Sequence, residues 1–196
     1  GTYLDNVSIT SPENGGTYFN NMLAIKKEAV KYYGAMQFSE ANYDMWIMEP
    51  YTVNAAYNVS ANDITLPAAV LQAPLYDINA SYEEKLGGIG YIIAHEITHA
   101  FDSNGAKFDE NGNIGNWWSE EDYISYEGLC EKVVEFFDGE EPIPAVRNNG
   151  RLTLNENIAD IGAVACITQL AKENNSDLKK LYEAVANTWV NTSSRE

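Results

Sequence analysis

The chain has 196 residues, enough for one domain with its own hydrophobic core, so no disulfide framework is needed to stabilise it. Its 29 acidic residues outnumber 12 basic ones and give a formal net charge of -17 and a pI near 4.3, a balance that repels nucleic acid and anionic lipid. No apolar run approaches the ~20 residues that span a bilayer, and no basic region followed by an apolar one opens the chain, so we expect it to be soluble.

An amphipathic helix is the first predicted element, with Thr17 as its N-cap and its end near Met36. The hydrophobic pattern then changes period. Residues 53–57 and 64–66 are short β-prone runs on either side of a turn-like segment, and Pro67 ends the second run. Together the two runs predict an edge hairpin.

Residues 83–101 are predicted to form a largely apolar helix. It contains three glycines, at positions 87, 88 and 90, and each is unfavourable in a helix by roughly 1 kcal/mol relative to alanine. We therefore expect another part of the chain to pack closely against this segment.

The remainder of the chain is predicted to be helix and loop. Ser119 should cap a helix that ends near Phe137, and a further helix is expected over residues 155–172. A last helix is predicted from residue 177 to about 191, with Ser176 as its cap. No repeat or low-complexity linker divides the sequence, so we predict a single domain over residues 1–196. Its class is α+β, predominantly helical, with a small edge sheet or hairpin.

The run His95-Glu96-Ile97-Thr98-His99 lies in the glycine-containing helix. Histidines at i and i+4 project from one helix face, so both can bind the same ion. The glutamate beside them is placed to take a proton from a metal-bound water, which is the chemistry this spacing serves in zinc peptidases. The chain has no other histidine, and apolar neighbours indicate burial. The alternative is a surface helix with two unrelated histidines.

A catalytic zinc usually has three protein ligands and a water, and here the third ligand cannot be histidine. One extended zinc pattern is excluded because the chain has Asp102 and Gly105 where that pattern needs glycine and histidine. A cysteine and a carboxylate both remain candidates. Glu156 is the best carboxylate, because it lies in a predicted helix that continues as a nearly all-apolar run, where buried acids need partners.

Two further acids are placed to orient the histidines. Asp160, one turn after Glu156, and Asp102, three residues after His99, can each accept the free ring N–H of a histidine. Asp160 is also grouped with Glu96 in the predicted catalytic set. The alternatives are a helix-terminal turn residue for Asp102 and a core carboxylate paired elsewhere for Asp160.

These residues together resemble the neprilysin family of gluzincin peptidases. Four motifs match in order and approximate spacing: Asn54-Ala55-Ala56-Tyr57, the motif at 95–99, Trp117-Trp118 and Glu156-Asn157-Ile158-Ala159-Asp160. The resemblance runs roughly from residue 18 onward and implies a thermolysin-like zincin catalytic domain. It also implies that His95, His99 and Glu156 are the zinc ligands, that Glu96 is the general base, and that Asp102 and Asp160 orient the histidines.

The resemblance further implies a substrate site. Asn54 and Ala55 match edge-strand residues that bind the substrate backbone by β-addition. Four apolar residues are expected to line a pocket beside the zinc: Val70, Leu75, Ile92 and Trp189. The alternatives are an ordinary hairpin edge for the first pair and plain core for the other four.

The chain also departs from the family pattern. Family members carry an oxyanion-stabilising histidine and a substrate-binding arginine downstream of the segment resembling residues 187–189, and this sequence ends at Glu196 before either. The helical lobe that closes over the cleft in family members is missing too. We therefore expect a fragment truncated at both ends, whose partner is the missing lobe of the same longer chain. The low cysteine content points to a bacterial relative or a recombinant fragment.

The sequence therefore predicts an endopeptidase with one zinc ion that hydrolyses peptide bonds of oligopeptides, through a zinc-activated water and Glu96 as general base. One alternative is a zinc- and peptide-binding fragment with weak or no catalysis, because the oxyanion histidine and the arginine are absent. Another is a structural helical domain with coincidental histidines. Peptide substrates are the expected partners, and nucleic acid is not. A bacterial cytoplasmic protein and a secreted or cell-surface domain both fit the sequence, which does not disclose the oligomeric state.

Overall fold

The structure, a computed structural model, describes residues 3–36, 38 and 46–190. The chain divides into two units, Gly1–Met45 and Trp46–Glu196, and each is described by itself. The expectation of a single catalytic domain over residues 1–196 stays a prediction.

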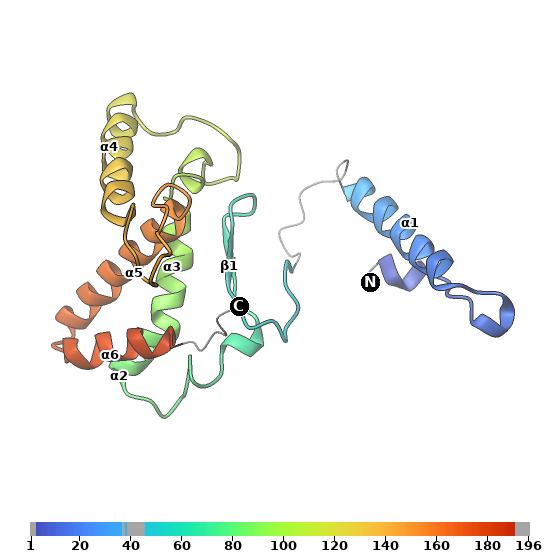
Figure 1. Cartoon of the computed structure of the whole chain (residues 1–196), viewed down its shortest axis with the longest axis horizontal. Helices are drawn as coiled ribbons and strands as arrows, with labels where there is room; N and C mark the ends of the chain where they lie inside the picture. The colour runs from blue at the N-terminus through green and yellow to red at the C-terminus, as the bar shows by residue number, and fades with distance from the viewer. Residues whose placement is uncertain (1–2, 37, 39–45, 191–196) are drawn as a thin grey trace. The chain divides into compact units, whose positions relative to one another are not determined.

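The first unit contains one long helix, α1 (Tyr18–Met36), after two short 3-10 turns, η1 (Tyr3–Asn6) and η2 (Pro12–Asn14). The predicted cap is confirmed, because the Thr17 hydroxyl accepts the amide N–H of Asn20 at 3.1 Å. Tyr3 packs against two tyrosines of α1, Tyr32 and Tyr33, with ring centroids 6.1 and 5.9 Å apart. These aromatic contacts hold η1 against the end of α1 (Figure 1).

The second unit starts with the predicted hairpin, formed by β1 (Ala56–Asn58) and β2 (Asp63–Thr65). The strands are antiparallel and pair Ala56 with Thr65, and Asn58 with Asp63. The paired region is shorter than predicted, and Asn54 and Ala55 lie before β1 rather than in the sheet. Continuing the register would place residue 54 opposite Pro67, which has no N–H to donate, and the 3-10 turn η3 (Ala68–Val70) follows at once.

The predicted helix at 83–101 is three consecutive segments: α2 (Tyr82–Lys85), a π-helical turn η4 (Leu86–Gly90) and α3 (Tyr91–His99). The close packing expected at the glycines is confirmed. A Cβ on Gly87 would lie 2.7 Å from the Cβ of Ala184, and one on Gly88 would lie 2.4 Å from the carbonyl oxygen of Leu75. Larger residues at these positions would push this helical stretch away from its neighbours.

The last helices are α4 (Glu120–Phe137), α5 (Leu154–Glu173) and α6 (Leu178–Thr188), and a 3-10 turn η5 (Gly105–Lys107) precedes them. Ser119 caps α4 as predicted, since its hydroxyl accepts the amide N–H of Asp122 at 3.1 Å. The predicted cap of α6 is wrong. Asp177 caps this helix through its carboxylate, while the amide of Ser176 is used by the carbonyl of Ala171 in the turn that ends α5. The predicted end near 191 falls outside the described residues.

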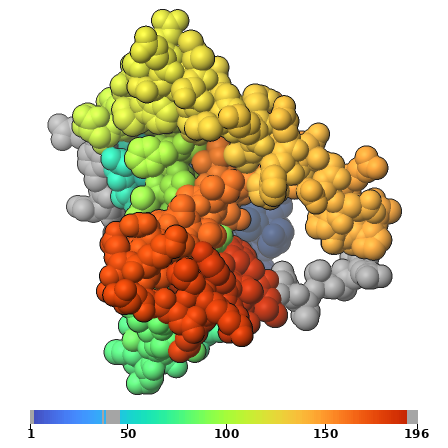
Figure 2. Space-filling model, turned by 90° about the vertical axis from the view of Figure 1, so that its left-hand side faces the viewer, coloured from blue at the N-terminus to red at the C-terminus, as the bar shows by residue number. Residues whose placement is uncertain are grey.

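The core of this unit lies where α3 packs along α5 and where α6 covers α2 and η4 (Figure 1). Figure 2 shows α4 in yellow and α6 in red on one face of the molecule. Small residues let α3 and α5 approach closely, because a Cβ on Gly162 would lie only 2.4 Å from the Thr98 side chain. The buried cluster consists of Leu86, Tyr91, Ala94, Ala163, Ile167, Ala171 and Leu181.

The observed architecture, mostly helical with one two-stranded sheet, confirms the predicted α+β class. Within the described ranges no helix has both the length and the apolar character required to cross a bilayer.

Candidate metal centre

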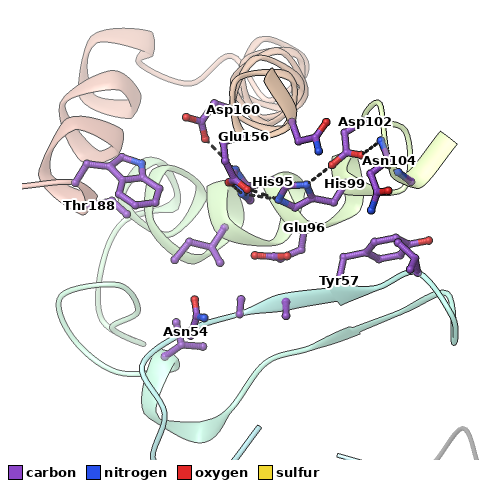
Figure 3. Close-up of a pocket in the computed structure, with 18 of the residues that line it drawn as sticks. Asn54, Tyr57, His95, Glu96, His99, Asp102, Asn104, Glu156, Asp160 and Thr188 are labelled. Carbon is purple, nitrogen blue, oxygen red and sulfur yellow. Dashed lines mark hydrogen bonds and ion pairs between the residues drawn. The ribbon is translucent and has the colours of Figure 1, made fainter. Parts of the chain in front are cut away.

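His95 and His99 lie one turn apart on α3 and point their rings to the same side, toward α5 (Figure 3). The ring planes are nearly perpendicular, with centroids 4.6 Å apart. The two Nε2 atoms are 3.0 Å apart. The i, i+4 spacing therefore brings both ring nitrogens to one point, as the motif predicts.

Glu156 reaches the same point from the first turn of α5. Its Oε2 atom lies 3.4 Å from Nε2 of His95 and 3.8 Å from Nε2 of His99. One donor atom from each of the three residues falls within 4.8 Å of the other two. Of the alternatives left open for the third ligand, the cysteines are not brought here, because neither Cys130 nor Cys166 lines this pocket.

Asp102 holds His99 from the end of α3. Its Oδ2 accepts the Nδ1–H of His99 at 2.7 Å, and its Oδ1 accepts the backbone N–H groups of Asn104 and Gly105, each at 2.7 Å. Asp102 is buried. Burial raises the pKa of the Asp102 carboxyl, but the hydrogen bonds from His99 and the two amides outweigh it and lower the pKa below its ordinary value.

Asp160 holds His95 from the second turn of α5. Its Oδ1 accepts the Nδ1–H of His95 at 2.8 Å and the hydroxyl of Tyr91 at 2.5 Å. Burial raises the pKa of Asp160, but the hydrogen bonds from His95 and Tyr91 lower it further, so the net shift is downward. The structure therefore places Asp102 and Asp160 beside the ring nitrogens they are predicted to orient.

The three facing atoms suit a divalent cation. Because each histidine gives its Nδ1–H to a carboxylate, each Nε2 presents a lone pair, and the Glu156 carboxylate adds negative charge to the same point. Bare lone pairs this close repel one another unless a cation lies between them. Tetrahedral zinc, with bonds of about 2.0–2.2 Å, places its ligand atoms about 3.4 Å apart. The observed separations of 3.0, 3.4 and 3.8 Å bracket that value.

Glu96 points away from the ligand cluster's α5 side and into the pocket beside β1 (Figure 3). It is only 7% exposed, and no other described residue hydrogen-bonds to its carboxylate. Its charge acts on the neighbouring histidine: the pKa of His99 is raised, first by the hydrogen bond to Asp102 and further by the charges of Glu156 and Glu96. A buried carboxylate without a partner at the metal site is free to exchange a proton with a bound reactant.

The pocket in front of these residues has a volume of about 810 Å³. The segment at 53–57 forms one side of it, so Asn54 and Ala55 lie in the pocket wall although they are outside the paired strands. The predicted apolar residues also line it. The full lining is Val53, Asn54, Ala55, Ala56, Tyr57, Val59, Val70, Leu75, Ile92, His95, Glu96, His99, Asp102, Asn104, Gly105, Asn155, Glu156, Asp160, Thr188 and Trp189.

Two features of the site were missed by sequence reasoning. Tyr91 lies four residues before His95 and therefore on the same helix face, a signal that could have identified it as a neighbour of the site. The amide of Gly105, which holds Asp102, was also missed. A Cβ at position 105 would lie 1.9 Å from the carbonyl oxygen of His99, so only glycine allows this turn.

Comparison with known proteins gives one family. A model described as Peptidase family M13 matches residues 54–192. A protein named neutral endopeptidase from Lactobacillus helveticus is 46% identical over 146 residues, which cover 74% of this chain and 22% of that protein. Another neutral endopeptidase, from Lactococcus lactis, is 43% identical over 162 residues, covering 82% of this chain and 26% of the relative. The chain thus spans about a quarter of the length of these relatives.

Solved structures agree with this assignment. The crystal structure of PepO from Lactobacillus rhamnosis matches with a TM-score of 0.85 and 31% identity, over 96% of this chain and 30% of that one. A Mycobacterium tuberculosis zinc metalloprotease, ZMP1, solved in complex with an inhibitor, matches with a TM-score of 0.75 and 32% identity, over 85% of this chain and 28% of that one.

Proposed function

This chain belongs to peptidase family M13, and we propose that it forms the catalytic domain of a zinc endopeptidase that hydrolyses peptide bonds of oligopeptides. The observation that carries the proposal is the meeting of three ligand atoms, from His95, His99 and Glu156, beside the unpartnered carboxylate of Glu96. Both lie in the wall of one large pocket. Such a combination supports hydrolysis better than a structural metal site, because a structural zinc is closed by four protein ligands.

In this proposal His95, His99 and Glu156 hold one zinc ion. Two neutral imidazoles and one carboxylate leave a net charge of +1 on the site. When bound, the ion would polarise the scissile carbonyl and lower the pKa of a water ligand toward ~7. Asp102 and Asp160 contribute by keeping each histidine in the tautomer that presents Nε2.

Glu96 is the proposed general base. It takes a proton from the attacking water and passes it to the nitrogen of the leaving amine when the peptide bond breaks. Its burial suits this role, because a carboxylate removed from bulk water and free of hydrogen bonds binds a proton more readily than an exposed one. Asp160 has a different part, since its bonded oxygen is already engaged by His95 and Tyr91. It is therefore a positioning residue.

The peptide is proposed to lie along residues 53–57, on the side of the pocket facing α3 (Figure 3). Asn54 and Ala55 would hydrogen-bond its backbone, as an added strand does at a sheet edge. The apolar residues of the lining, Val70, Leu75, Ile92 and Trp189, would take one substrate side chain. An enclosing helical lobe stays a prediction.

A second candidate function is zinc and peptide binding with weak or no catalysis. It is favoured by the histidine content, because both histidines of the chain lie in the metal site and none is left to stabilise the oxyanion. Losing one oxyanion donor costs about 10²–10³ in kcat. The two candidates share the metal site and differ only in turnover.

The test combines metal content with cleavage of a quenched fluorescent peptide. We expect one zinc ion per chain, bound with equal affinity by the parent and Glu96→Gln, and cleavage lowered at least about 10²-fold in that variant. Glu121→Gln, at an exposed position in the first turn of α4, is the matched control and should leave both readouts unchanged. Zinc binding without cleavage by the parent would support the second candidate. A chain that binds no zinc would refute both.

A further inference from the structure

The two histidine-orienting carboxylates are held in different ways. Asp102 has a side chain only 5% exposed and is fixed by two backbone N–H donors, so its position follows from the turn after α3. The Asp160 side chain is 49% exposed. No backbone donor holds it among the described residues, and its terminal torsion is soft, so it needs another contact to keep one orientation.

The hydroxyl of Tyr91 supplies that contact. It donates to Oδ1 of Asp160 at 2.5 Å, the same oxygen that accepts the ring N–H of His95. The tyrosine itself is well placed to hold a carboxylate. It is 3% exposed, belongs to the buried core cluster, and packs edge-to-face on Trp189 with ring centroids 5.9 Å apart. Burial and the bond to Asp160 raise the pKa of Tyr91, so the hydroxyl stays a donor near neutral pH.

We propose that Tyr91 is a positioning residue of the metal site. By anchoring Asp160, it fixes the direction in which His95 presents Nε2 to the ion. The chain of contacts runs from the core, through the Tyr91 hydroxyl and one carboxylate oxygen, to a metal ligand. This inference rests on the proposed zinc site and adds to it a residue outside the HExxH motif and the glutamate-containing helix.

Two opposing effects follow from removing the hydroxyl, and the structure indicates which one dominates. A hydroxyl that donates to Asp160 withdraws charge from the oxygen facing His95, so its loss would make that imidazole a stronger ligand. However, Asp160 is half exposed, and water can replace the lost hydrogen bond. The charge effect is then small, whereas the lost anchor frees the carboxylate to rotate. Zinc binding should therefore weaken.

The experiment measures the zinc dissociation constant of the full chain by competition with a chromophoric chelator. Partners that orient metal ligands typically contribute 10–100-fold to affinity, and we expect Tyr91→Phe to raise the dissociation constant about tenfold. The visible spectrum of the cobalt(II)-substituted protein should also change, because the direction of one imidazole ligand changes. A purely structural role for Tyr91 would leave this spectrum unaltered.

Tyr126→Phe is the matched control. This tyrosine hydroxyl donates to the carbonyl oxygen of Phe101 at 2.8 Å and does not line the metal-site pocket. It should keep the parent zinc affinity and cobalt spectrum. The melting temperature of metal-free Tyr91→Phe should stay within about 3 °C of the parent, which separates positioning from unfolding.

Unchanged or tighter zinc binding by Tyr91→Phe, with zinc bound normally by the parent, would overturn the inference and leave the proposed function standing. An equal loss of affinity in Tyr126→Phe would also overturn it. A parent chain that binds no zinc would refute the proposed function itself.

Discussion

A methyl group added at Gly162 tests whether the spacing of α3 and α5 builds the metal site. A Cβ there would lie 2.4 Å from Cγ2 and 2.6 Å from Oγ1 of Thr98. Carbon atoms in contact are about 3.5–4.0 Å apart, so the two helices must separate by about 1 Å at this point. Rotation of Thr98 cannot relieve the clash. Its Cβ is itself 3.0 Å away, and its hydroxyl donates to the carbonyl of Ala94 at 2.7 Å.

The displacement would reach the ligands, because α5 carries Asp160 and Glu156 on the turns before Gly162. Metal–ligand distances tolerate only about 0.2 Å, so a shift of about 1 Å should weaken zinc binding at least tenfold. Overpacking costs about 1–3 kcal/mol, and alanine recovers about 1 kcal/mol of helix propensity. We therefore expect a net loss near 1 kcal/mol and a melting temperature about 3 °C lower.

The assay is zinc competition with a chelator, together with thermal unfolding of the metal-free chain followed by circular dichroism. Gly128→Ala is the control, because a Cβ at that position in α4 meets nothing within 4 Å. It should keep zinc affinity and slightly raise the melting temperature. Adding Thr98→Ala to Gly162→Ala should restore part of the affinity. Parent-like zinc binding by Gly162→Ala alone would refute the reasoning.

Two further substitutions test the ligands and the carboxylate that is held by the backbone. Glu156→Gln removes the only anionic ligand atom and should weaken zinc binding more than the 10–100-fold typical of an orienting partner, measured by the same competition; a smaller effect would exclude Glu156 as a ligand. Asp102→Asn should weaken zinc binding about 10–100-fold. It should also flatten the acid limb of urea-unfolding stability in the metal-free chain. The pKa of Asp102 is lowered in the fold, so its stabilisation is present above about pH 4 and is lost as pH falls through the folded value; an unaltered acid limb would contradict this.

The local chemistry of the site follows from the sequence, because residues three or four apart on a helix must meet. His95 and His99 share one face for this reason, and Asp102 reaches His99 across a single turn. The caps at Thr17 and Ser119 are likewise short-range hydrogen bonds that their own residues determine. Where two neighbouring residues can both cap, as at Ser176 and Asp177, the sequence does not decide. There the turn that ends α5 uses the first residue and leaves the second to cap α6.

Contacts between segments distant in the chain needed the tertiary structure. Glu156 was a strong candidate for the third ligand, but only the close packing of α5 on α3 brings its oxygen to within 4 Å of both histidines. The same packing gives Asp160 its contact with Tyr91, which lies 69 residues earlier. The pairing limit at Pro67, which keeps Asn54 out of the sheet, depends on the register of two strands. Short-range geometry thus specifies the two histidines and their motif, while helix packing completes the metal site and selects the groups that hold it.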